Sequence, residues 1–161
     1  MYDREYTPDR ISELKENEIF VFGSNLTGAH GGGAERLAYN RFGAVWGEGV
    51  GLHGQTYAIP TIQGGVETIK PYVDDFIRFA KEHSRLTFLV TRIGCGIAGF
   101  RDEEIVHSLR MPLMWRISTF RRNLWRAWCI NLHGNDRKQV TFASIYHEDV
   151  YERKMNQKGR K

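Results

Sequence analysis

The sequence predicts an α/β domain with a largely parallel sheet that is covered on both faces. Three short apolar segments typical of buried strands alternate with two segments whose apolar residues recur at helical spacing. Two of the strand-like segments run directly into glycine-rich loops. Alternation of this kind favours parallel strands, and such sheets bind ligands beyond the carboxyl ends of the strands. We therefore expect both loops to line one crevice.

The first strand is expected at residues 19–22, where "IFVF" is aromatic and β-branched. A helix is predicted over residues 32–43, because its apolar residues share one face and Gly43 is a suitable stop. The second strand is placed at residues 55–61 and ends at Pro60.

An amphipathic helix is predicted over residues 64–83, with Pro71 near its first turn or bending it. The third strand is expected at residues 85–94, a continuous apolar run that ends in "GCGIAGF". Glycines in residues 47–54 indicate a hairpin-like connection ahead of the second strand.

Composition indicates one globular domain rather than a membrane or disordered chain. The 161 residues are 41% hydrophobic and 26% charged, without the long apolar run that a membrane span needs. The charged N-terminal segment has no apolar signal core. Cys95 and Cys129 are too few for a disulfide framework, and no set of metal ligands has a familiar spacing. We expect a cytoplasmic protein without a metal or cofactor.

The first glycine loop predicts anion binding. A helix that begins with bare glycines exposes unpaired N–H groups and the positive end of its dipole, and phosphate oxygens can approach closely. A tight turn is the favoured explanation of a single glycine, whereas three in succession at a helix start favour anion binding over a turn. The spacing is neither that of a Walker loop nor that of the dinucleotide motif. The candidate ligand-binding residues here are Gly23, Ser24, Asn25, Leu26, Gly31, Gly32, Gly33 and Ala34.

Two roles are open for Asn25. Its amide could hydrogen-bond a ribose hydroxyl, or it could hold the loop through an Asx-turn.

The second loop repeats the pattern after the third strand. Its glycines permit close approach of a phosphate or ribose, and its aromatic residue could stack on a sugar or base. The candidates are Gly94, Cys95, Gly96, Ile97, Ala98, Gly99 and Phe100. We interpret Cys95 as a small buried cysteine rather than a nucleophile, because no base lies nearby in the sequence.

Other polar residues have ordinary interpretations. His30 and His53 are expected to be solvated loop side chains, and Asp74 and Asp75 to be surface charges of a helix.

At this point the sequence resembles a known family. "FGSNLTGAHGGGAERLA" is similar to the asparagine and glycine-triplet loop of macro domains, and "RIGCGIAGF" to their second phosphate loop. The resemblance covers roughly residues 8–105, and small macro-domain-like proteins of bacteria and phages are the most similar group. It implies a three-layer α/β/α macro-domain-like sandwich with a mixed, largely parallel central sheet.

The resemblance also implies a ligand: ADP-ribose, a related metabolite or an ADP-ribosylated macromolecule. Asn25 would then lie near the distal ribose, as a low-priority catalytic candidate, and the two loops would hold the diphosphate. Some family members only bind ADP-ribose, whereas others hydrolyse ADP-ribose linkages. The resemblance therefore leaves three possibilities: a binding protein, an ADP-ribosyl hydrolase or an ADP-ribose phosphoesterase. The aspartate of a "GDIT"-like stretch and the paired glutamates of poly-ADP-ribose glycohydrolases are missing here.

Charge divides the chain unevenly. Residues 1–106 carry 11 basic and 15 acidic side chains, whereas residues 107–161 carry 12 and 4. The latter begin with arginines interleaved with tryptophans, a pattern suited to nucleic acid or a membrane surface. A nucleic-acid-binding accessory protein that acts through this segment is therefore the alternative function.

A frameshift is a second explanation for that segment. One inserted base in the codon of residue 106, with permissible codons chosen, converts "IVHSLRMPLMWRISTFRRNLWR" into "IAPLAADAADVENIYLPKEFVE". The new string offers a charged amphipathic helix and then a strand. We therefore divide the chain into a core of residues 1–105 and a basic segment of residues 106–161 that completes the domain irregularly or is disordered.

Overall fold

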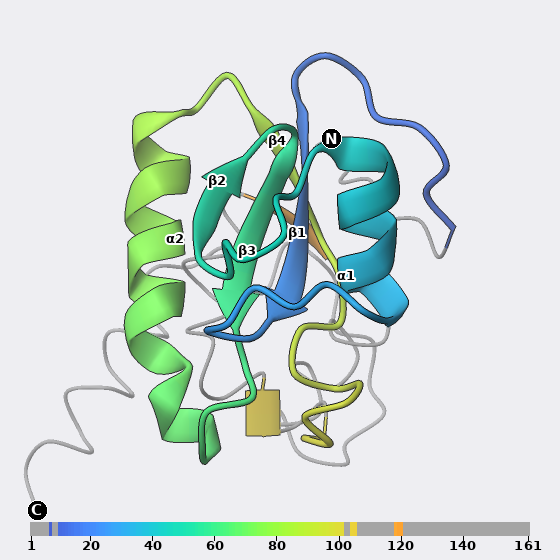
Figure 1. Ribbon diagram of the computed structural model, residues 1–161. Helices are drawn as coiled ribbons and strands as arrows, with labels where there is room; N and C mark the ends of the chain where they lie inside the picture. Colours follow the sequence, from blue (N-terminus) through green and yellow to red (C-terminus); the bar gives the residue numbers. More distant parts are fainter. Residues whose placement is uncertain (1–6, 8–9, 102–103, 106–117, 121–161) are drawn as a thin grey trace, which may run out of the picture. The chain divides into compact units, whose positions relative to one another are not determined.

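The structure of the chain is a computed structural model that describes residues 7, 10–101, 104–105 and 118–120. All of these belong to the first of two units into which the chain divides, Met1–Trp128. The described strands form one mixed sheet in the order β2-β3-β1-β4-β5. This confirms the predicted α/β class and the largely parallel sheet (Figure 1).

The parallel part of the sheet is built around β1, Glu18–Ser24. It pairs on one side with β3, Thr56–Pro60, and on the other with β4, Thr87–Val90. β5, Ser118–Phe120, adds to β4 in parallel, while β2, Gly51–His53, forms an antiparallel hairpin with β3. Because β3, β1 and β4 run the same way, their carboxyl ends lie at one edge.

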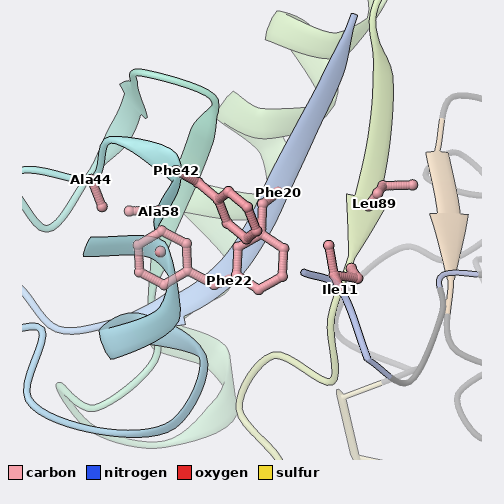
Figure 2. Close-up of a cluster of buried hydrophobic side chains, with 8 residues drawn as sticks. Ile11, Phe20, Phe22, Phe42, Ala44, Ala58 and Leu89 are labelled. Atoms are coloured by element: carbon pink, nitrogen blue, oxygen red, sulfur yellow. The ribbon is translucent and has the colours of Figure 1, made fainter. Parts of the chain in front are cut away.

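Alternate strand residues pack on opposite faces of the sheet, as the twofold repeat of a strand requires. Phe20 and Phe22 of β1 join a buried cluster with Phe42, which Figure 2 shows in close-up. The buried members of that cluster are Ile11, Phe20, Phe22, Ala38, Phe42, Ala44, Ala58 and Leu89.

Helix α1, Gly33–Leu37, continues into η1, a π-helical turn at Ala38–Phe42. The two segments pack against the face of the sheet that carries Phe20 and Phe22. Gly43 ends the segment in the left-handed conformation at φ 87°, as its glycine stop predicted. The helix runs in the predicted place, but its second half is wound as a π-helix, which the apolar spacing did not indicate.

The other face is covered by α2, Lys70–Glu82, and Figure 1 shows α1 and α2 on opposite sides of the strands. Phe76 of α2 is fully buried, and its ring centroid lies 5.0 Å from that of Tyr57 and 5.3 Å from that of Phe88. Pro71 lies in the first turn, where its missing N–H costs no helical hydrogen bond. A short 3-10 turn, η2 (Val66–Thr68), precedes the helix.

Two predicted elements have different bounds. The helix expected at residues 64–83 is α-helical only from Lys70 to Glu82, because the 3-10 turn η2 precedes it. β4 is shorter than the predicted run of residues 85–94, because Thr91 and Ile93 already belong to the loop that leads to the glycines. β2 forms an antiparallel hairpin with β3, which confirms the hairpin-like connection expected at residues 47–54. β5 lies in the basic segment beyond residue 105 and adds a strand to the sheet beside β4. The rest of the basic segment lies outside the described residues.

Candidate functional site

Both glycine-rich loops line one cleft, as expected from their positions after parallel strands. β1 and β4 end side by side, and a Cβ built on Gly23 would lie 3.2 Å from the backbone nitrogen of Gly94. Gly23 and Gly94 both line a cleft of about 150 Å³ at these strand ends. Its described lining residues are Gly23, Gly32, Gly33, Ala34, Glu35, Thr61, Ile62, Thr91, Arg92, Gly94, Gly96, Ile97 and Ala98.

Within the described part of the chain, neither packing nor backbone angle requires glycine at three positions of these loops. A Cβ on Gly31 or Gly96 would have no described neighbour within 4 Å, and one on Gly32 would make only an ordinary contact of 3.9 Å with Ile97. None of the three has the positive φ that favours glycine. Two of them, Gly32 and Gly96, line the cleft from opposite loops. Backbone is thus exposed to the cleft without a folding reason.

Other glycines of the two loops do have a backbone reason. Gly33, Gly94 and Gly99 have φ angles of 53°, 75° and 74°, in the left-handed region. Gly94 is also crowded, because an added Cβ would lie 2.6 Å from Cδ1 of the buried Ile105. These positions shape the loops.

The amide of Asn25 is committed to the loop. Its Oδ1 accepts hydrogen bonds from the Ala29 N–H at 2.9 Å and the Thr27 hydroxyl at 2.6 Å. Its Nδ2 donates to the Ala29 carbonyl at 2.9 Å and to the Glu35 carboxylate at 3.3 Å. The loop-holding role is therefore observed, and Asn25 is not among the described residues that line the cleft.

Glu35 is a cleft residue that the sequence analysis did not select. It follows the glycine triplet on α1, is only 7% exposed and lines the cleft. Burial raises the pKa of its carboxyl, while the hydrogen bond from Asn25 and the nearby charge of His30 act in the opposite direction. The sequence signal was its place on the helix face next to Ala34, but acidic residues in a first turn are common helix stabilisers.

Residues just after the parallel strands also line the cleft. Thr61 follows β3 and Thr91 follows β4, and both are buried with hydroxyls that donate to backbone carbonyls of β1. Arg92 is exposed at the same edge. No other described residue that lines the cleft is a lysine or an arginine. The rule that ligands bind beyond strand ends could have indicated all three.

The other predicted residues have different surroundings. Ser24 is buried, and its hydroxyl donates to the carbonyl of Gly49, while Leu26 is 52% exposed. Cys95 is half-buried with its thiol 3.7 Å from the Ile93 carbonyl. Phe100 packs beside Gly94. These four, with Gly31 and Gly99, are not among the described lining residues.

The expectation of a solvated His30 is wrong. The side chain is 1% exposed and packs edge-on against Phe22, with Tyr39 and Trp46 nearby. Its Nε2 lies 3.0 Å from the Val45 carbonyl, and its buried Nδ1 has no hydrogen-bond partner among the residues that the structure describes. An aromatic pocket stabilises the ring, which the loop sequence did not reveal. His53, by contrast, is half-exposed, with Nε2 3.1 Å from the Val50 carbonyl.

The acidic pair on α2 has the expected surface role. Asp74 pairs with Lys70 and Asp75 with Arg78, each at 2.6 Å. Among the described residues, no group of three or more histidine, cysteine or acidic side chains could hold a metal ion. None of the described helices has the length and apolarity to cross a bilayer.

Comparisons with models of protein families, with curated proteins and with solved structures found no match to this chain.

Proposed function

We propose that the chain binds ADP-ribose, or a related nucleotide-diphosphate metabolite, in the cleft between its two glycine-rich loops. The observation that carries the proposal is the pair Gly32 and Gly96, which line the cleft although neither φ nor packing against the described residues requires glycine there. A ligand that contacts the backbone itself accounts for the missing side chains. The resemblance of both loops to those of macro domains points to the same class of ligand.

The described side chains and backbone fit an anionic ligand. The start of α1 presents N–H groups that have no intrahelical partner, and Arg92 adds a positive charge at the strand ends. In this proposal the diphosphate lies between Gly32 and Gly96, while the threonines behind it keep the strand ends together.

Calorimetric titration tests the proposal. ADP-ribose should bind more tightly than AMP, because AMP cannot span the two loops with a diphosphate. Gly32→Glu should weaken ADP-ribose binding about a hundredfold or more, since it places a carboxylate against the phosphates. Asn40→Glu, at an exposed position of η1 outside the cleft lining, adds the same charge and is the matched control. Equal weak responses to both nucleotides, or unchanged binding by Gly32→Glu, would refute the proposal.

Removal of ADP-ribose from modified macromolecules is an extension of this proposal. Its test is incubation of the protein with an ADP-ribosylated protein and measurement of the released ADP-ribose. Binding without release would identify a binding module. The alternative of nucleic-acid binding depends on residues 106–161, nearly all of which lie outside the described residues.

A further inference from the structure

The cleft contains a charge that a pure phosphate site should avoid. Among its described lining residues, Glu35 is the acidic side chain, and it is 7% exposed. A carboxylate beside phosphates repels them, and partial burial strengthens the repulsion because less water screens it. A cleft that had to hold only a diphosphate would gain nothing from this residue.

Asn25 cannot readily supply a contact with ligand hydroxyls. The N–H and carbonyl of Ala29, both 2.9 Å away, fix the orientation of its amide. A side-chain amide has two N–H donors and one carbonyl acceptor with two lone pairs. Thr27 takes the second lone pair and Glu35 the second donor direction, so all four positions are used. A ligand hydroxyl would have to displace a loop contact.

Toward the described residues, Glu35 uses only part of its hydrogen-bonding capacity. An ionised carboxylate offers about four lone-pair positions. The Asn25 amide approaches its two oxygens at 3.3 and 3.5 Å from one side, which occupies only part of that capacity. Hydroxyl groups of a ligand are the donors that would offset the repulsion of the phosphates, because charge-assisted hydrogen bonds are stronger than neutral ones.

We propose that Glu35 recognises hydroxyl groups of the ligand beside its diphosphate, and that Asn25 is a positioning residue that holds the carboxylate. The ligand class is then a diphosphate with a free vicinal diol next to the phosphates, as in a ribose, and not bare pyrophosphate. This inference rests on the proposed function, because it assumes a diphosphate between the two loops.

The test compares ADP-ribose with inorganic pyrophosphate by calorimetry at neutral pH. Wild-type protein should prefer ADP-ribose. Glu35→Gln should lose about tenfold or more in affinity for ADP-ribose, the usual effect of losing a hydrogen bond to a charged group. Its affinity for pyrophosphate should stay the same or rise, because a negative charge is gone. Glu82→Gln, at an exposed position of α2, is the matched control and should change neither affinity.

Asn25→Ala tests the positioning role through a pH profile. ADP-ribose affinity should fall as acid protonates Glu35, and the midpoint should move to higher pH in Asn25→Ala, because the hydrogen bond that lowers the carboxyl pKa is lost. An effect confined to loop structure would lower the affinity without moving that midpoint, and would overturn the assignment of Asn25.

The outcomes separate this inference from the proposed function. Equal losses for both probes in Glu35→Gln, or no loss for ADP-ribose, would overturn the role of Glu35. Wild-type protein that binds pyrophosphate as tightly as ADP-ribose would overturn it without any variant, and anion binding would stand. Absence of binding to either probe would overturn the proposed function and this inference together.

Discussion

Ile97 lies across the cleft from Gly32, with its Cδ1 atom 3.9 Å from where a Cβ on Gly32 would stand. The second loop thus brings an apolar side chain, 77% exposed, over the start of α1. The gap between them admits a methyl group without a clash, so the fold itself places no demand for glycine at this position.

Gly32→Ala should therefore leave stability unchanged or raise it by about 0.4–1 kcal/mol, because alanine restricts the unfolded chain. Gly32 has φ −149° and ψ 166°, which alanine adopts freely. Affinity for ADP-ribose should fall, because the methyl group occupies the side of the cleft where phosphate oxygens approach. Thermal unfolding and calorimetry on one preparation measure both effects. A loss of stability with intact binding would contradict this account.

Gly94→Ala should behave in the opposite way. The residue has φ 75°, and an added Cβ would lie 2.6 Å from Cδ1 of Ile105, which is fully buried. Left-handed backbone at a residue other than glycine costs about 1–3 kcal/mol, and the clash adds to this cost. Urea denaturation should show that loss. A stability equal to that of Gly32→Ala would mean that the loop rearranges without cost.

Truncation of Phe76 should unfold much of the α2 face. Its ring is fully buried between those of Tyr57 and Phe88, which come from two different strands. Replacement of a buried phenylalanine by alanine costs about 3–5 kcal/mol. The matched control is Tyr72→Ala, which removes a half-exposed ring from the same helix. Denaturation curves that shift equally for both variants would contradict the packing described here.

Much of the fold could be predicted from the sequence because its signals are local. A few neighbouring residues were enough to predict three features: the strand before Gly23, the helix around Phe76 and the helix end at Gly43. The glycines of residues 47–54 indicated the hairpin that contains β2. β5 could not be predicted, because a strand this short depends on pairing with a neighbour that is remote in the chain.

The site divides in the same way. Convergence of the glycine loops follows from the direction of parallel strands, so it could be predicted. The burial of His30 could not, because it depends on the segment around Val45 lying against the first loop. The contact between Asn25 and Glu35 could not either, because it depends on the turn that ties Asn25 to Ala29. A sequence pattern identifies the residues of a loop, but it does not show which of their polar groups form hydrogen bonds within the loop.

Glu35 should make stability depend on pH. Burial raises the pKa of its carboxyl in the folded state, so the fold binds a proton more strongly than the unfolded chain does. Its contribution to stability is therefore favourable at low pH, and it is lost as pH rises from the ordinary pKa of a glutamate through the raised one. Glu35→Gln stays neutral and can still accept the hydrogen bond from Asn25.

The variant should consequently gain stability relative to wild type as pH rises from the ordinary pKa of a glutamate to neutral pH, because the proton that favours the wild-type fold is lost there. Thermal unfolding of both proteins across this range measures the difference. Glu82→Gln, which alters an exposed glutamate, should show no such trend. A difference that is constant with pH would mean that Glu35 ionises as freely in the fold as in the unfolded chain.

The position of β5 gives the frameshift hypothesis a physical test. β5 occupies residues 118–120 and pairs with β4 in parallel. The string obtained by inserting one base places the letters "IYL" at these positions, where the present chain has "STF". β-branched and aromatic residues suit a strand, and a longer apolar strand adjoining Phe88 and Val90 should bury more surface.

A protein that carries the restored string from residue 106 should therefore melt at a higher temperature than the present chain. A tail with the same composition in scrambled order is the control. Sequencing of the coding DNA decides the origin of the segment. If no single-base shift gives an open reading frame that encodes the restored string, the frameshift hypothesis is wrong.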